Sequence, residues 1–505
     1  MVEPMTHWLN KLEEYDMTTG QLQLDRLMLT HSFTRITSLV VSPQIDILAS
    51  LPNVPLLRHL AIFNFELDID YLELIHEKSP KLTHFRLTSG LIRMMPNKVF
   101  PYEIQPLVNV ASFIISDDVA IADKECFFLD YLCIKYPKLL HLTFLSSFKN
   151  TLLSRHRSMR YRGGDVVTHE EFESTRKNYL KEGESRFLSK LSNTITTLSL
   201  ETSLFDNIYA GLGQSELNPT EIHFQDSSEP QQQRDEKLQF KYIGKLTKLK
   251  KLVTSIGDSQ DPFTRDLRAS KLEDLSLTIR RSNHINCRDK SQQKELDFGR
   301  LLYSFPGLHS LTLDGPFIKL TTNDHFTSRA THLKLRKLQL RRCITLPLLV
   351  VFLRFYGKCV NYLEWPFTRL VKTKDPDKGK SIKIYELNFP DHTLNILHLT
   401  RIPYLRPPQH GRGLFSLYIE VKAGTTIGKY VVEAVADDRI TNVKDITHQT
   451  IDLTCDVIDL TDLPEENDNM TKVIITLKEL RELKMEGYNK EIILHRVVPQ
   501  PTVID

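Results

Sequence analysis

The sequence predicts an α/β solenoid with a parallel sheet on its concave side and helices on its convex side. Three observations support this fold class: an apolar phrase that recurs along the chain, the nearly regular spacing of its copies, and helical periodicity in the segments between them. A single strand–turn–helix unit cannot cover its own apolar face, so such units must stack to form a core.

The recurring phrase is Leu-x-x-Leu-x-Leu or a close apolar variant, and a proline often stands shortly before it. Clear copies are residues 54–62 (VPLLRHLAI), 79–87 (SPKLTHFRL), 136–144 (YPKLLHLTF) and 305–313 (FPGLHSLTL). Apolar residues at steps of three and then two are typical of a short strand whose ends turn into a common core. We therefore expect the side chains between the leucines to face away from that core.

The copies are spaced like leucine-rich repeats. The second apolar positions of successive phrases are Leu39, Leu60, Phe85, Phe113, Leu142, Leu198, Ile222, Leu252, Leu275, Leu311, Leu338, Leu363, Leu397 and Leu417. The first and last are 378 residues apart over 13 intervals, a mean of about 29, at the upper end of the range of about 20–29 for this class. The 56-residue interval after Leu142 indicates a degenerate repeat or an insertion. Residues 480–485 repeat the phrase and could close the array.

The segments between phrases define the rest of the organisation. Residues 69–78 and 127–136 carry apolar residues at steps of three and four, which predicts helices. We expect an N-terminal cap or remnant over 1–35, irregular repeats over 36–420 and a less regular section over 421–505. Polar stretches near 155–184, 226–237, 280–295 and 372–380 predict solvated loops on the rim of the solenoid.

The clearest repeat spans residues 335–363, where Cys343 follows the phrase LRKLQLRR and Cys359 precedes the next phrase. It resembles the cysteine-containing repeat of F-box/leucine-rich-repeat proteins, the substrate receptors of cullin-type ubiquitin ligases. The resemblance covers roughly residues 36–420 and implies substrate recognition, with a cullin-ligase adaptor as a partner. An F-box module itself has no match before Ile36.

Composition excludes several other classes of protein. The net charge of +3, from 66 basic and 63 acidic residues, indicates no overall field that would attract nucleic acid. The six cysteines include no Cys-x-x-Cys pair, residues 1–16 lack the apolar core of a signal peptide, and the most apolar stretch, 346–355, is about half a membrane span. We therefore expect a cytoplasmic or nuclear protein without a membrane partner.

Motifs for catalysis are missing from the sequence. It contains no phosphate-binding Gly-x-x-x-x-Gly-Lys-Ser/Thr loop, no Gly-x-Ser-x-Gly elbow and no His-Glu-x-x-His pair. We therefore expect a binding protein rather than an enzyme, with no catalytic residue and no cofactor.

Side chains between the leucines are the candidate partner-binding residues. Tyrosine and arginine are the side chains that most often anchor interfaces, and the histidines recur at concave positions of their phrases. The candidates are His59, His84, Arg86, Arg336, Lys337, Tyr362 and Tyr418. His59 and His84 share one position in their phrases, so they could stack on neighbouring strands about 4.8 Å apart. No carboxylate or thiolate accompanies the histidines in these phrases, so we expect a partner face and no metal site.

A second candidate site lies near the C-terminus, where residues 450–462 (TIDLTCDVIDLTD) precede an acidic run. This segment resembles a tandem SUMO-interacting motif, in which a short β-branched strand adds to the edge of the modifier's sheet and flanking acids meet its basic rim. The resemblance implies apolar contacts and acidic contacts within residues 451–468 from Ile451, Leu453, Val457, Ile458, Asp459, Leu460, Asp462, Glu465 and Glu466. The alternative is an ordinary repeat strand with acidic turn residues.

The functional expectation is a protein-interaction scaffold of the F-box/leucine-rich-repeat type. One alternative is a freestanding nuclear adaptor that reads SUMO. Another is an RNA-associated scaffold that uses the loop from Arg155 to Arg162, in which four arginines surround Tyr161. Glutamates follow soon after this loop, so we expect no nucleic-acid partner.

Overall fold

The computed structural model describes residues 14–16, 35–41, 54–93, 104–116, 119–122, 127–145, 187–188, 190–191, 193–201, 212, 217–225, 245–256, 271–279, 294–315, 318–321, 334–341, 344–345, 353, 357–366, 371–374, 383–400, 414–423, 426–435, 471–486 and 491–495. The chain divides into two compact units. Unit 1 comprises Met1–Ser255 and Ala269–Lys271, and unit 2 comprises Ile256–Arg268 and Leu272–Asp505. Among the described residues, every helix is too short or too polar to span a lipid bilayer.

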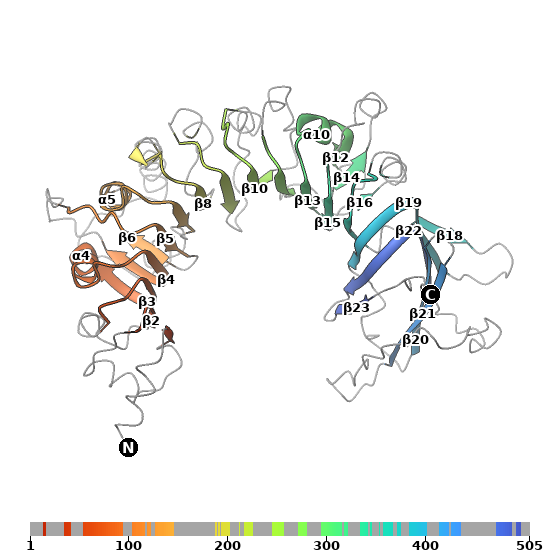
Figure 1. Ribbon diagram of the computed structural model, residues 1–505, viewed down its shortest axis with the longest axis horizontal. Helices are drawn as coiled ribbons and strands as arrows, with labels where there is room; N and C mark the ends of the chain where they lie inside the picture. The colour runs from red at the N-terminus through yellow and green to blue at the C-terminus, as the bar shows by residue number, and fades with distance from the viewer. Residues whose placement is uncertain are drawn as a thin grey trace, which may run out of the picture. The chain divides into compact units, whose positions relative to one another are not determined.

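Unit 1 is built on a ladder of parallel strands, one for each copy of the phrase (Figure 1). These strands are β2 (Ser38–Val41), β3 (His59–Asp68), β4 (His84–Arg93), β5 (Ser112–Ile115), β7 (His141–Phe144), β8 (Thr197–Glu201), β9 (Glu221–Gln225) and β10 (Lys251–Ile256). β1 (Glu14–Asp16) adds to β2, and β6 (Val119–Ala122) pairs with the second half of β4, both in parallel. The residues aligned across the ladder are Tyr15, Leu39, Leu60, Phe85, Phe113, Leu142, Leu198, Ile222 and Leu252.

Each phrase contributes buried and outward-facing positions in a fixed order. In β3 the leading position is His59, the first buried position is Leu60, the middle position is Ala61 and the second buried position is Ile62; these names are used below for the aligned residues of other strands. Leu57, the first leucine of the phrase, is buried as well. Apolar residues at steps of three and two therefore all reach the core, as the phrase predicts.

Backbone hydrogen bonds in the turns explain why the register stays constant. We call each strand with the turn that leads into it a rung. The carbonyl of Arg58 accepts from two successive amides of the next rung, Thr83 N at 2.8 Å and His84 N at 2.9 Å. Carbonyls one residue before the leading position repeat this double acceptance in both units, including Arg336, which accepts from Asn361 and Tyr362. Each rung is thereby aligned to its neighbour before the strand begins.

The helices predicted in unit 1 are confirmed. α4 spans Ile69–Lys78, and α5 spans Phe127–Lys135, one residue shorter than expected. Asp68 caps α4, since its side chain accepts from Tyr71 N at 2.8 Å. The His76 ring of α4 meets the edge of buried Phe85, with centroids 5.3 Å apart. This helix therefore covers the face toward which the buried positions point.

Unit 2 continues the same repeat with its own ladder of parallel strands. They are β11 (Asp274–Ile279), β13 (Ser310–Asp314), β15 (Lys337–Arg341), β17 (Tyr362–Pro366), β19 (Lys383–Thr400) and β22 (Thr471–Glu486). The aligned first buried positions are Leu275, Leu311, Leu338, Leu363, Leu397 and Leu483. The prediction that Leu338 and Leu363 are buried on neighbouring parallel strands is confirmed, with exposures of 0% and 3%. Cys343 lies outside the described residues.

Outside the main ladder of unit 2, α10 (Phe298–Ser304) follows β12 (Lys294–Asp297) and is capped by Asp297. A second parallel sheet joins β12 to β14 (Ile318–Thr321) and β16 (Ile344–Thr345). β12 takes up the last residues of the polar stretch 280–295, which was expected to be a loop. Similarly, β18 (Val371–Lys374) takes up the first residues of 372–380 and pairs antiparallel with β19.

The placement of Leu417 in the array is wrong. The structure pairs Leu397 with Leu483, in the phrase at residues 480–485, whereas Leu417 in β20 (Leu414–Ala423) lies opposite Thr471. The reason lies in the pattern: apolar residues recur at 415, 417, 419 and 421, and this period of two indicates a long strand rather than the three-then-two phrase. β20 forms an antiparallel hairpin with β21 (Thr426–Val435), and β23 (Glu491–His495) pairs antiparallel with β22.

Candidate partner-binding faces

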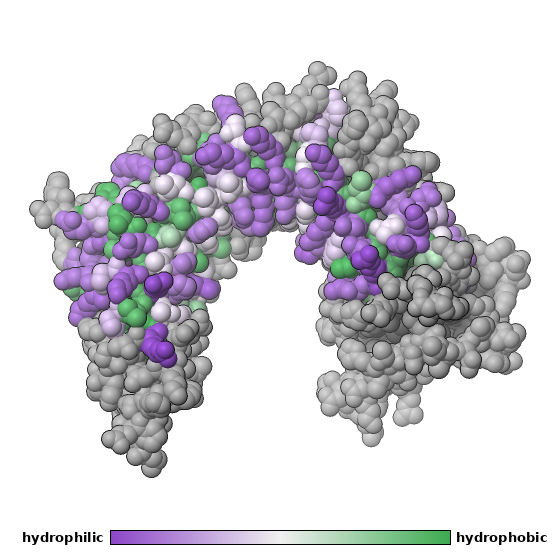
Figure 2. Space-filling view, in the orientation of Figure 1, coloured by the Kyte–Doolittle hydropathy of each residue, from purple (hydrophilic) through white to green (hydrophobic). Residues whose placement is uncertain are grey.

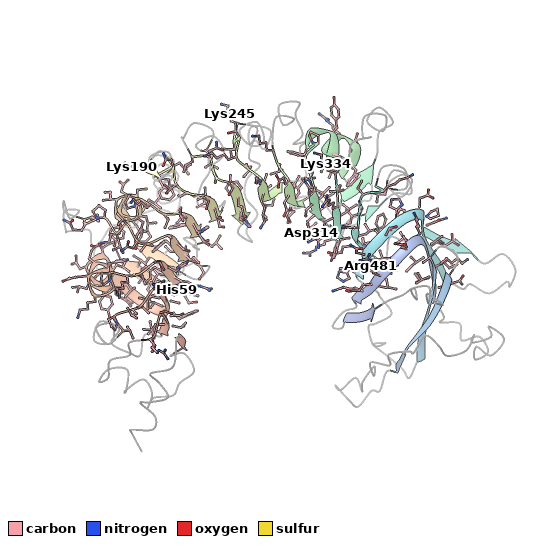
Figure 3. All side chains as sticks on the ribbon, viewed as in Figure 1. His59, Lys190, Lys245, Asp314, Lys334 and Arg481 are labelled. Carbon is pink, nitrogen blue, oxygen red and sulfur yellow. The ribbon has the colours of Figure 1, made fainter. Side chains whose placement is uncertain are left out.

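In each unit, the leading and middle positions project from the sheet face opposite the buried positions, and we call this surface the polar face of that unit. His59 lies on the side of the strands away from α4 (Figure 3). Over unit 1, apolar and hydrophilic residues stand side by side (Figure 2). In both units the polar face is formed by side chains of the ladder strands and of the turns that lead into them.

The histidines of unit 1 lie in one row on the polar face. The register places His59 opposite His84, and Ser112 stands between His84 and His141. The rings of His59 and His84 have centroids 4.2 Å apart at 46°, so the expected neighbouring contact is present. Burial lowers the pKa of His84, and the neighbouring charges that His59 and His141 carry when protonated lower it further. Both effects favour the neutral form of His84.

Arg86 occupies the middle position of β4, two residues after His84. Its Nε donates to Thr88 Oγ1 at 3.2 Å, and its guanidinium lies 5.9 Å from the centroid of the Phe63 ring. Arg58, just before His59, is exposed. Among the described leading and middle positions from β2 to β7, none is a carboxylate; Glu66, exposed in the second half of β3, lies outside these positions.

The polar face of unit 2 contains a chain of side-chain hydrogen bonds across three strands. Thr312, Gln339 and Glu364 are aligned middle positions of β13, β15 and β17. Thr312 Oγ1 donates to Gln339 Oε1 at 3.0 Å, and Gln339 Nε2 donates to Glu364 Oε2 at 2.5 Å. Arg341 Nε donates to Glu364 Oε1 at 3.0 Å. Gln339 and Glu364 are only 8% and 4% exposed, although they lie on the face without helices.

Two of the predicted anchors in unit 2 contact each other. The Lys337 ammonium lies 5.2 Å from the centroid of the Tyr362 ring, and Tyr362 Oη lies 3.5 Å from His398 Nδ1. Arg336, exposed, directly precedes Lys337 and has no contact of this kind with Tyr362 among the described interactions. Tyr418 belongs to β20, outside the repeat register, and its side chain lies outside the described residues.

Sequence reasoning did not single out Arg58, Phe63, Thr312 or Arg341. The signal that could have found them is their position, because each stands beside or between leucines of an aligned phrase. What the sequence lacked was the pairing of specific side chains across strands, which depends on exact register.

Beneath α4 and α5, a buried polar cluster joins consecutive repeats of unit 1. His76 Nε2 lies 2.8 Å from Tyr136 Oη, while Tyr131 Oη donates to Glu73 Oε1 at 2.6 Å and Lys135 Nζ pairs with Glu73 Oε2 at 2.5 Å. Burial, helped by the charge of Lys135, lowers the pKa of His76 to about 3. Burial also raises the pKa of both tyrosines. The cluster connects one helix to the next, with His76, Lys135 and Tyr136 buried and Glu73 partly exposed.

The candidate SUMO-interacting segment, residues 451–468, lies outside the described residues, as does the loop from Arg155 to Arg162. β21 ends at Val435 and β22 begins at Thr471, on either side of the candidate SUMO segment. Both ideas stay predictions. Within the described part of the chain, no group of three or more His, Cys, Asp or Glu side chains is arranged to hold a metal ion.

Neither protein-family models nor curated proteins match this chain.

Proposed function

We propose that this chain is a protein-binding scaffold, a leucine-rich-repeat solenoid in which the polar face of each unit is the concave, partner-binding side of that unit's own ladder. The observation that carries the proposal is the constant register of the rungs. In every aligned phrase the buried positions face the core, so leading and middle side chains form continuous rows. A continuous row of fixed side chains on strands suits an extended protein surface better than a small ligand.

Within this class, we propose the substrate-recognition role in ubiquitin ligation that the resemblance of residues 335–363 implies. The support is that Lys337–Arg341 and Tyr362–Pro366 are neighbouring parallel strands with Leu338 opposite Leu363, the arrangement that consecutive repeats of this type require. This role calls for two partners, a substrate on a polar face and a cullin-ligase adaptor elsewhere.

The test is affinity purification of the full chain from cells, followed by mass spectrometry. One variant carries His59→Ala with Arg86→Ala in unit 1, and another carries Lys337→Ala with Tyr362→Ala in unit 2. We expect at least one of them to lose a partner that the wild type retains. The matched control is Glu77→Ala, an exposed residue of α4 that lies off the polar face. Retention of every partner by both variants would contradict the scaffold proposal, whereas absence of a cullin adaptor would contradict only the ligase role.

A further inference from the structure

The polar face of unit 1 between β2 and β7 carries charge of one sign. Arg58 and Arg86 are permanently positive, and His59, His84 and His141 become positive on protonation. No described carboxylate projects beside them from these strands; the neighbouring strands carry Ser38, Val40, Ser112 and Ile114. The nearest acids on the strands are Glu14 and Asp16 of β1, which the register places opposite Ser38 and Val40 of β2, Glu66 in the second half of β3, Glu201 at the end of β8 and Glu221 at the start of β9.

The contrast with later strands is that, among the described residues, these cations have no carboxylate partner. On β9, Glu221 Oε2 lies 3.5 Å from both Lys251 Nζ and His223 Nε2, so the basic groups there have a partner. Arg86 instead contacts a hydroxyl and an aromatic ring. A partner that brought carboxylates to this surface would find donors already held in place.

Apolar side chains alternate with the cations on this surface. Val40, Ala61, Phe63 and Ile114 are all half-buried and occupy middle or following positions beside the basic residues. From His59 to His141 is three strand steps, about 14 Å, which an extended segment of four or five residues spans at about 3.3 Å each. The surface thus fits a short extended segment that mixes acidic and apolar residues.

We infer that Arg58, His59, His84, Arg86 and His141 form a binding surface for an acidic segment of a partner protein, which they hold more tightly as the pH falls. This inference rests on the proposed scaffold function. The arginines supply attraction at every pH, and protonation of the histidines adds to it as the pH falls. Because a bound carboxylate favours protonated imidazole, binding is coupled to proton uptake, and acidification strengthens it. Interleaved apolar residues favour a peptide over a nucleic acid, whose phosphates would need a denser row of cations.

The test measures fluorescence anisotropy of labelled peptides added to the full chain. The acidic probe alternates Glu with Leu, and the control peptide has Gln in place of each Glu. We expect the acidic probe to bind at least about tenfold more tightly than the control and to bind severalfold more tightly at pH 5.5 than at pH 7.5. Raising the salt concentration should weaken binding of the acidic probe.

Variants locate the effect. His59→Ala with His84→Ala should reduce the difference in affinity for the acidic probe between pH 5.5 and pH 7.5. Arg86→Gln should weaken binding of the acidic probe at both pH values. Lys337→Gln, on the polar face of unit 2, is the matched control and should leave binding unchanged. Equal affinity for the Glu and Gln peptides, or a labelled oligouridine that binds more tightly than the acidic probe, would overturn the inference. The acidic probe could fail to bind while the variant with His59→Ala and Arg86→Ala still loses a cellular partner. That result would leave the scaffold proposal standing and would contradict only the inference that the bound segment is acidic.

Discussion

The two polar faces have the same backbone register but opposite side-chain organisation. At the middle position of β4, Arg86 is exposed and contacts no carboxylate among the described residues. At the middle position of β17, Glu364 is buried and accepts hydrogen bonds from Gln339 and Arg341. Adjacent strands about 4.8 Å apart hold complementary side chains within hydrogen-bonding reach. When the side chains at neighbouring middle positions are complementary, they hydrogen-bond to one another; we call such a face closed, and a face without these bonds open. The closed face of unit 2 stabilises its own unit, whereas the charged side chains of the open face of unit 1 remain available to a partner.

The largest expected effect concerns what the two units share, their buried positions. Leu142→Ala in unit 1 and Leu338→Ala in unit 2 should each lower the free energy of unfolding by about 2–5 kcal/mol, because each leaves a cavity in a packed row. Chemical denaturation with hydrogen exchange read on peptides of the same unit measures this. A loss below about 1 kcal/mol in either unit would mean that its phrase does not pack as the shared register implies.

The next effect distinguishes the faces. Glu364→Ala should cost about 1–3 kcal/mol, because it leaves the buried Gln339 amide without its acceptor. Arg86→Ala, at the equivalent middle position in unit 1, should change stability by no more than about 0.5 kcal/mol. Equilibrium denaturation of both variants checks the pair. Equal losses would erase the distinction between a closed and an open face.

A third prediction separates the buried histidine of unit 1 from the exposed ones. The folded pKa of His76, about 3, lies below its ordinary value of 6.5, so the unfolded chain binds more protons between these values. The contribution of neutral His76 to the free energy of unfolding should therefore be fully present above pH 6.5. It should fall as the pH drops toward 3, by at most about 1.4 kcal/mol per pH unit. Denaturation at a series of pH values measures the slope, and His76→Gln should remove this contribution. A wild type and a variant with the same slope would contradict it.

The smallest expected effect is one that both faces share. Lys337 with Tyr362, and Arg86 with Phe63, each place a cation over a ring. Double-mutant cycles should give a coupling energy of no more than about 0.5 kcal/mol for each pair, the low end of the range for such contacts, because both cations are accessible to solvent. A much larger coupling energy in unit 2 alone would show that the hydrogen bonds among Thr312, Gln339 and Glu364 also strengthen the contact of Lys337 with Tyr362.

Much of the repeat was predictable, because the phrase encodes burial through spacing alone. Leu57, Leu60 and Ile62 lie at steps of three and two and all reach the core. The helices after β3 and before β7 followed from their apolar periodicity. The end of the array was harder: Leu417 fits a loose apolar pattern, and only the pairing of β22 with β19 and β20 shows that Leu483 takes the next rung.

By itself, the sequence determined which residues enter the core and which project outward, since a local periodicity is enough to decide a residue's face. Only the tertiary structure decided which outward residues meet. Thr312, Gln339 and Glu364 are 27 and 25 residues apart along the chain, yet hydrogen-bond in one row. His59 and His84 make their contact across a similar gap of 25 residues. Such contacts depend on exact register between rungs, and that register is set by backbone hydrogen bonds between turns, which no local pattern of side chains encodes.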